Sequence, residues 1–372
     1  MADKNAHLGA LDSFRGIAAL SVVIYHLYIV SAVSEWEFFR YSHLFVPFFF
    51  VLSGFVIAYV YDKSSFRFKD FMIARSFRIL PLYYIMLACF LALECLNYVL
   101  YYKFGLFFKN IPFSEDRGLD QIVPNILLLQ SWLPWTYPLS FNNPAWSLSV
   151  EWYLYIFFGI LMFVPRFTRY GVFLLCASLA YFHLLGFLRS ESLSGVLYFC
   201  SGVLVYWLFA LCKLRTIPPL LLTTLEILLI ILSAYIIAHN HAQYAVFVFG
   251  ALVFVFGFSS YQHRRVIGGG AVASLLESRF FLFFGTLSYS IYISHYFVIS
   301  IIKAAMSLLA KYGYWEMVRL DEKLYVDFGN PLIANLYLVL NLCVVVAFAY
   351  LLHKYIEKPS IALGKNLLKK RT

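Results

Sequence analysis

The chain has 372 residues, of which 62% are hydrophobic and only 13% are charged. Its 39 Phe and 29 Tyr residues and its mean hydropathy of +0.78 lie far from the balance of a soluble globular domain. This composition excludes a soluble enzyme and indicates an integral membrane protein. The net charge of +10 requires no nucleic acid partner, because basic loops against anionic lipid account for it.

Apolar stretches follow one another along the chain, each near the roughly 17 to 25 residues that cross a bilayer. We therefore expect an all-α bundle of about ten transmembrane helices. No cleavage site for a signal peptide follows the first stretch, so that helix is expected to stay. The stretches are residues 11–30, 44–61, 79–98, 145–164, 170–188, 193–211, 217–238, 244–258, 280–309 and 331–352.

The distribution of basic residues predicts the orientation. If both termini are cytoplasmic, 20 of the 29 Lys and Arg residues fall on the inner side, as the positive-inside rule requires. The other nine fall outside: Arg40, Lys103, Lys109, Arg117, Arg189, Lys303, Lys311, Arg319 and Lys323.

One domain, residues 1–372, accounts for the chain, because it shows no repeat and no low-complexity tract. A short apolar run at 122–135 is too short to span and predicts an interfacial or re-entrant helix on the outer face. The six cysteines lie in or beside apolar stretches without metal-ligand spacing, so we interpret them as core residues and predict no metal site.

Ionisable residues inside the apolar stretches mark a candidate site, because the hydrocarbon core penalises them. Arg15 and His26 are eleven residues apart, which on one helix places both on one stripe about 16 Å apart. Counting residues from the cytoplasmic edge puts His26, Glu151 and His295 at a common depth of about 20 to 22 Å.

Arginines gather at the opposite, cytoplasmic edge. Arg75 and Arg78 are expected to open the third helix, where a spacing of three places two guanidinium groups on one face, suited to a phosphate. With Arg15 nearby, they would form an anion site at the cytosolic mouth of a polar shaft that leads to the histidines. A long phosphorylated acyl donor needs this geometry.

Six phrases in order along nearly the whole chain resemble the acyltransferase 3 family. They are LDSFRGIAAL at 11–20 with His26, FFFVLSGF at 48–55, RSFRILPLYY at 75–84, AWSLSVEW at 145–152, LSYSIYISH at 287–295 and IEKP at 356–359. The resemblance implies a multi-span enzyme of the bacterial inner membrane that moves acetyl from cytosolic acetyl-CoA to a hydroxyl of an extracytoplasmic or lipid-linked glycan, such as lipopolysaccharide. Some relatives carry an extracytoplasmic esterase-like domain, which we do not expect here.

The resulting hypothesis assigns a role to each candidate. His26 is the general base or a transient acetyl carrier, Glu151 orients its imidazolium, and Ser147 or a tyrosine holds the acceptor or the oxyanion. Arg15, Arg75 and Arg78 bind the phosphates of CoA. Trp146, Tyr292 and His295 are assigned to the acceptor.

Structural alternatives stand beside these roles. The arginines serve equally as cytoplasmic anchors, and Asp12 pairs with Arg15 at i, i+3 on a helix. Ser147 and Glu151 share a face and would suit a helix-packing hydrogen bond. A transporter or flippase for a sugar or lipid-linked sugar would use the same buried charges, but the chain lacks the internal repeat typical of that class.

Overall fold

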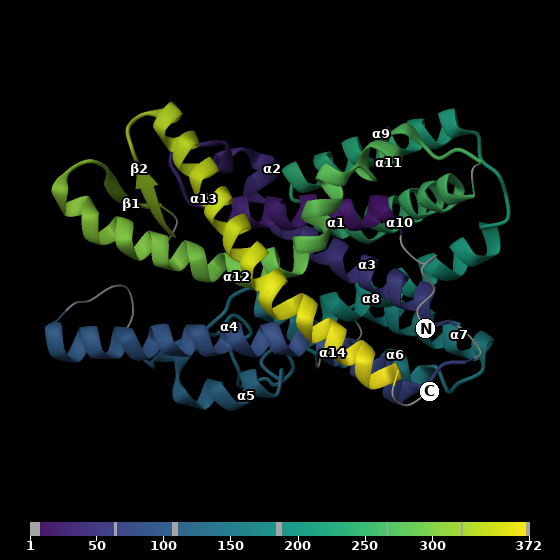
Figure 1. Ribbon diagram of the computed structural model, residues 1–372, viewed down its shortest axis with the longest axis horizontal. Coiled ribbons are helices and arrows are strands. Elements are labelled where there is room, and N and C mark those ends of the chain that lie inside the picture. Colours follow the sequence, from purple (N-terminus) through teal and green to yellow (C-terminus); the bar gives the residue numbers. More distant parts are fainter. Residues whose placement is uncertain are drawn as a thin grey trace. The chain divides into compact units, whose positions relative to one another are not determined.

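The computed structural model describes residues 8–62, 65–105, 111–183, 188–265, 267–320 and 323–369, and every predicted stretch contains a helix (Figure 1). The chain divides into two compact units. Unit 1 comprises Met1–Val22, Glu37–Phe68 and Ile156–Ser288, and unit 2 comprises Val23–Trp36, Lys69–Tyr155 and Tyr289–Thr372.

Unit 1 is helical and packs aromatic rings at its centre. α3 and α8 cross at Gly54 and Gly202, where an added Cβ would collide with the carbonyl oxygens of Phe199 and Val51. The glycines therefore allow the two backbones to touch. The unit contains the first part of α1 (Gly9–Tyr25), α2 (Glu37–Arg40), α3 (Phe45–Tyr61), α7 (Arg166–Tyr181), α8 (Ser190–Cys212), α9 (Pro219–Ala238), α10 (Ala242–Arg264) and α11 (Ala271–Leu276).

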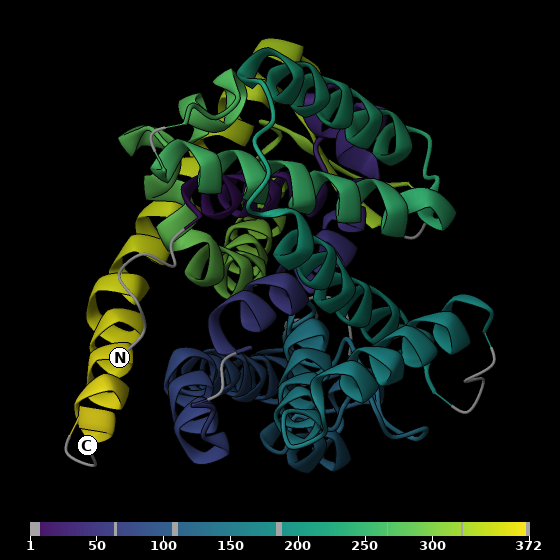
Figure 2. The same ribbon diagram turned by 90° about the vertical axis from the view of Figure 1, so that its right-hand side faces the viewer.

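Unit 2 combines long helices with one β-hairpin. β1 (Glu316–Leu320) and β2 (Lys323–Asp327) are antiparallel, with Glu316 opposite Asp327. Figures 1 and 2 show α13 (Pro331–Leu352), a π-helical turn (His353–Glu357) and α14 (Lys358–Lys369) as one continuous rod. The unit also holds most of α4 (Phe68–Phe104), α5 (Ile122–Ile126), most of α6 (Ala145–Leu161) and most of α12 (Arg279–Leu309).

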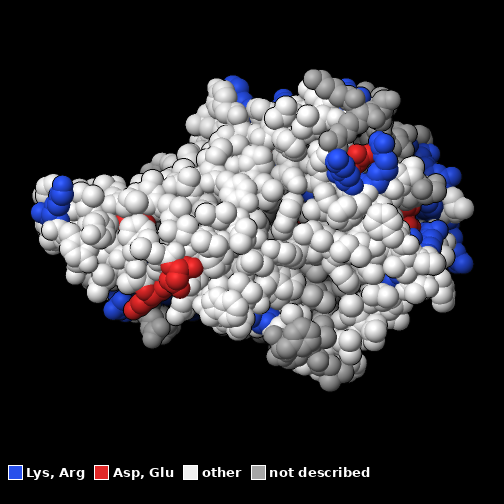
Figure 3. All heavy atoms as spheres, turned by 90° about the horizontal axis from the view of Figure 1, so that it is seen from below, with Lys and Arg blue, Asp and Glu red and all other residues white. Residues whose placement is uncertain are grey.

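Seven helices in the described part of the chain are long and apolar enough to cross a bilayer, which makes the protein a multi-pass membrane protein. The expected number was about ten. α1 and α6 have 17 residues each and α7 has 16, whereas the span that contains α3 runs from Ser42 to Tyr61 and has 20 residues. These three helices are therefore shorter than the seven spans. Figure 3 shows a face whose surface belongs mostly to uncharged residues, as lipid contact requires.

Two helix boundaries differ from the prediction. α1 ends at Tyr25 because the chain then turns into a β-bridge: the N–H of Val30 and the carbonyl of Tyr28 both bond to Val326. His26 therefore lies one residue beyond the helix rather than within it. α4 begins at Phe68, so Arg75 lies inside the helix rather than at its start.

The run at 122–135 is helical only over α5, which ends at Ile126. Leu128 has a φ of +54°, which a helix does not tolerate, so the predicted helix over the whole run is wrong. The predicted stretch 170–188 is helical to Tyr181, and its residues 184–187 lie outside the described ranges.

Candidate active site

Two histidines from distant parts of the sequence meet in unit 2. His26 lies in the turn that follows α1, and His295 lies within α12, where it is fully buried. The Nε2 atom of His295 is 3.2 Å from the Nδ1 atom of His26, and the ring centroids are 4.9 Å apart. The structure thus brings together two residues that the sequence assigned to one site.

The hydrogen bonds fix which nitrogen carries each proton. The Nδ1 atom of His295 lies 3.2 Å from the carbonyl oxygen of Ile291, and a carbonyl only accepts, so this nitrogen is the donor. In a neutral ring the Nε2 of His295 is then an acceptor, and the Nδ1–H of His26 donates to it. The remaining nitrogen of His26, Nε2, carries the lone pair and is the basic atom of the pair.

Aromatic rings surround the two imidazoles. The ring of Tyr25 lies 4.8 Å from that of His26, and the ring of Tyr296 lies 5.5 Å from it on an edge-to-face geometry. Tyr292 lies 6.1 Å from His295. Because apolar surroundings lower the local dielectric, hydrogen bonds and charges at this pair are stronger than they would be in water.

Ser147 and Tyr292, both predicted for the site, are also in contact. Their hydroxyl oxygens are 2.9 Å apart, and Ser147 donates to the carbonyl of Pro144 at 3.1 Å. Since a serine hydroxyl has one proton, Tyr292 is the donor between the two. Trp146 precedes Ser147 at the start of α6, and its carbonyl accepts a hydrogen bond of 3.0 Å from Ser131.

Glu151 and the two arginines of α4 are linked through tyrosines. The hydroxyl of Tyr155 donates to Glu151, and the guanidinium of Arg75 lies 5.9 Å from the centre of the same Tyr155 ring. Tyr289 interacts electrostatically with both Glu151 and Arg78. The carboxylate and the two cations of the predicted site therefore each lie near the phenol of Tyr155 or Tyr289.

Arg15 belongs to unit 1. Its guanidinium bonds to the Ser288 hydroxyl at 2.7 Å and to the Gly285 carbonyl at 3.2 Å, and it pairs with Asp12 at 3.2 Å. The i, i+3 ion pair that the sequence offered as a structural alternative is therefore confirmed. Gly16 and Gly285 let the helices approach, because a Cβ on Gly16 would lie 2.5 Å from the Gly285 nitrogen.

Glu357 is a buried carboxylate for which the sequence predicts no role. Glu357 is 4% exposed and accepts hydrogen bonds from Ser290 at 2.6 Å and from His353 at 3.0 Å. It also interacts electrostatically with Tyr289, beside Glu151. Glu357 lies in the phrase IEKP, so the family motif could have marked it as a functional residue. Its hydrogen bond to Ser290 connects the π-helical turn after α13 to α12.

Tyr28 lies two residues after His26 in the chain, and its ring faces two ammonium groups. Burial raises the pKa of Tyr28 above its usual value, and the neighbouring phenols of Tyr25, Tyr296 and Tyr325 raise it further, so the ring stays neutral. The ammonium nitrogens of Lys303 and Lys323 lie 5.0 and 4.9 Å from its centre. Two cations therefore lie over the ring of Tyr28.

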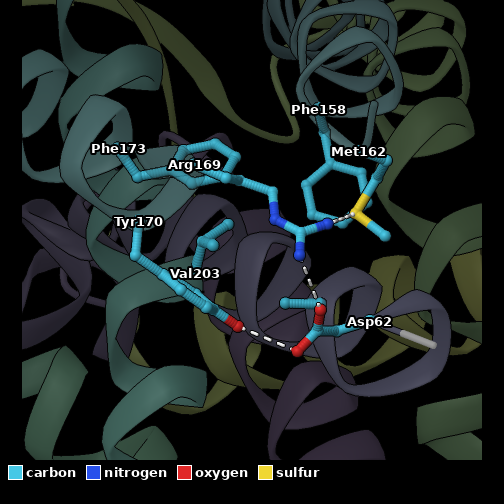
Figure 4. A pocket seen from close by; sticks show the side chains of 8 residues that line it. Asp62, Phe158, Met162, Arg169, Tyr170, Phe173 and Val203 are labelled. Atoms are coloured by element: carbon cyan, nitrogen blue, oxygen red, sulfur yellow. Dashed lines mark hydrogen bonds and ion pairs between the residues drawn. The ribbon is translucent and has the colours of Figure 1, made fainter. Parts of the chain in front are cut away.

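A separate hollow lies in unit 1 and is filled by an ion-pair network (Figure 4). Asp62 pairs with Arg166 at 3.0 Å and Arg169 at 3.2 Å, and Tyr170 donates to it at 3.0 Å. These groups satisfy the carboxylate of Asp62. We therefore interpret the network as a structural link between the end of α3 and α7.

Comparison with known proteins identifies relatives of one kind. A family model described as an acyltransferase domain matches residues 8–353. A Staphylococcus aureus (strain COL) protein whose name proposes it as an O-acetyltransferase is 24% identical over 96% of this chain and 58% of its own length. Acyltransferase MdmB of Streptomyces mycarofaciens is 32% identical over 43% of this chain and 40% of its own length.

A third relative, named Protein 2 in picA locus, comes from Rhizobium radiobacter and is 33% identical over 38% of this chain and 75% of its own length. The chain spans less than two thirds of the first two relatives. No solved structure matches it.

Proposed function

Because the chain belongs to the acyltransferase 3 family, we propose that it transfers an acetyl group from acetyl-CoA to a hydroxyl of a glycan, with His26 as the base. The observation that carries the proposal is the histidine pair, in which the Ile291 carbonyl and His295 leave the lone pair of His26 on Nε2. A half-buried base with a defined lone pair suits acyl transfer to an alcohol.

The direct route has two steps. The Nε2 of His26 takes the proton from the sugar hydroxyl as its oxygen attacks the thioester carbonyl, which gives a tetrahedral oxyanion. The oxyanion collapses, the C–S bond breaks, and the imidazolium returns the proton to the CoA thiolate. His295 stabilises that imidazolium by accepting its Nδ1–H.

A relayed route uses the same nitrogen. The Nε2 of His26 attacks the thioester, the C–S bond breaks and CoA leaves as its thiolate. The sugar hydroxyl then attacks the acetyl group, the bond from the acetyl carbon to Nε2 breaks, and the hydroxyl proton goes to the thiolate. The tetrahedral oxyanion of either route needs a donor nearby. We assign that role to the Tyr292 hydroxyl, which would turn its proton from Ser147 to the oxyanion while Ser147 stays bonded to the Pro144 carbonyl.

The donor is held by cations. Arg75 and Arg78 are proposed to bind the phosphates of acetyl-CoA, with Glu151 and Tyr155 setting their positions, and Arg15 is proposed near the entrance. Trp146 and His295 would border the acceptor. We propose that the chain lies in a bacterial inner membrane with cytoplasmic termini, which the distribution of basic residues supports. Family membership favours this activity over the transporter alternative.

The test replaces His26 by alanine in membranes supplied with radiolabelled acetyl-CoA and the glycan of the source cell envelope. We expect transfer to fall by at least about 100-fold while the protein inserts normally and binds CoA.

His239→Ala is the matched control. The Nδ1 of His239 also lies 3.0 Å from a carbonyl four residues earlier, that of Tyr235, but His239 is exposed at the end of its helix. Substantial transfer by His26→Ala would remove His26 from the chemistry. Label retained on the wild-type protein without acceptor would select the relayed route.

A further inference from the structure

A strap of the outer loop is fastened to α4 by one buried carboxylate. Glu94 accepts a hydrogen bond from the Phe113 N–H at 3.1 Å and pairs with Arg117 at 3.1 Å. The Glu94 side chain is only 5% exposed and that of Arg117 is 32% exposed, so the ion pair is partly protected from solvent and holds residues 113–117 against α4. Asp116 lies in this strap, in the short 3₁₀ turn Glu115–Arg117.

Two side-chain oxygens, one in the strap and one in the segment before α6, are buried without a hydrogen-bond partner within the described part of the chain. They are the Oδ1 atoms of Asp116 and Asn142. The Asn142 amide nitrogen donates to the Ile293 carbonyl at 3.0 Å, which fixes the amide and leaves its oxygen as an acceptor. Buried acceptors without donors are costly and therefore uncommon in folded proteins.

Both oxygens belong to the surroundings of the histidine pair. Tyr296 interacts electrostatically with Asp116 and Arg117, and its ring is 5.5 Å from that of His26. Asn142 is bonded to Ile293, two residues before His295 in α12. A ligand that donates hydrogen bonds to Asp116 and Asn142 would thus lie near the stretch of α12, residues 293–296, that carries His295.

We propose that Asp116 and Asn142 form the acceptor subsite, which binds a sugar ring through hydroxyls other than the one that is acetylated. The inference rests on the proposed function. A sugar hydroxyl supplies the proton donor that each oxygen lacks, and a carboxylate is the strongest hydroxyl acceptor a protein offers. Binding two hydroxyls would fix which third hydroxyl faces His26, so these residues would determine the position acetylated.

The test uses purified protein in proteoliposomes, radiolabelled acetyl-CoA and a panel of p-nitrophenyl glycosides of neutral hexoses as acceptors. We expect Asp116→Ala to raise the acceptor KM at least about tenfold, with the KM for acetyl-CoA unchanged. Asp116→Asn should lose less, because its amide oxygen still accepts a hydrogen bond. Glu115→Gln is the matched control, since it removes a carboxylate from the exposed adjacent position of the same turn.

The outcomes separate the subsite from the activity. Wild-type acceptor KM in Asp116→Ala overturns the subsite and leaves the proposed function intact. An equal rise in the KM for acetyl-CoA also overturns it, because the strap would then act on the fold as a whole. If the wild-type protein binds acetyl-CoA but acetylates none of the glycosides, the glycan acceptor of the proposed function fails, and the subsite fails with it.

Discussion

In a hydrogen-bonded pair of histidines, the group that bonds to the outer ring decides which ring donates the shared proton. Here that group is the carbonyl of Ile291, which holds the proton of His295 on Nδ1 and so makes His295 the acceptor for His26. In the proposed reaction His295 would take the place that a carboxylate has in a serine hydrolase triad, but without its charge. A neutral acceptor suits a site within an apolar helix, because a buried carboxylate would carry a larger desolvation cost.

If His295 positions His26 in this way, an acceptor of similar reach should replace it in part. We expect His295→Ala to lower kcat by about 100-fold, and His295→Gln to recover part of that loss, because the amide oxygen of Gln reaches about as far as Nε2 of His. Acetyl-transfer kinetics measure both variants. Equal activities of the Gln and Ala variants would show that His295 only fills space.

The candidate residues lie on or beside helices. The sequence predicted where these helices lie better than it predicted where they begin and end. Apolar residues recur along each span, so all ten stretches were found as helices. The start of α4 was missed because its first turns carry Arg75 and Arg78, yet Phe71, Ile79 and Leu82 continue one buried face at helical spacing. The end of α1 depends on Val326, a residue about 300 positions away that no local pattern reveals.

In the candidate site, too, some features could be predicted from the sequence and others could not. The constant rise of a helix was enough to place His26 and His295 at one depth, and the structure puts them in contact. The contact between Ser147 and Tyr292 and the strap at Glu94 depend on how helices rotate about their axes and on how a loop folds back. Neither follows from the spacing of residues along one chain.

Glycine contacts between α1 and α12 give a prediction at the scale of elements. A Cβ on Gly285 would lie 2.5 Å from the Asp12 carbonyl oxygen, and the backbone there has no freedom to retreat. We expect Gly285→Ala to destabilise the protein by about 1 to 3 kcal/mol, seen as a lower apparent Tm in detergent. The same variant should raise the KM for acetyl-CoA if Arg15, which bonds to the Gly285 carbonyl, contributes to donor binding.

Gly171→Ala is the control for this variant, because an added Cβ there meets nothing within 4 Å. It should be neutral or stabilising by up to about 1 kcal/mol, since Ala favours a helix over Gly. A Gly285→Ala protein as stable as Gly171→Ala would mean that α1 and α12 separate without cost.

At the scale of the whole molecule, the catalytic candidates gather in one unit. His26, Ser147, Glu151, Tyr292 and His295 all belong to unit 2, together with the arginines of α4, whereas Arg15 belongs to unit 1. The α4 helix has 37 residues, a length of about 55 Å, which exceeds the roughly 30 Å of the hydrocarbon core. One helix therefore has room for a donor site at one membrane surface and a strap contact near the other.

The proposed transfer needs the two ends of α4 on opposite sides of the membrane, and single cysteines test this. In a background without the six native cysteines, we expect Leu119→Cys to react with an impermeant thiol reagent in intact cells. Thr216→Cys should react only after the cells are opened. Leu119 is 66% exposed and Thr216 is also exposed, so both thiols are accessible. In the chain the two positions are separated by α6, α7 and α8.

Retained acetyl transfer by the cysteine-free protein is the control for its fold. The reverse pattern would place Asp116 and its strap on the side of acetyl-CoA and overturn the orientation, because the positive-inside rule would then fail for 20 of 29 basic residues.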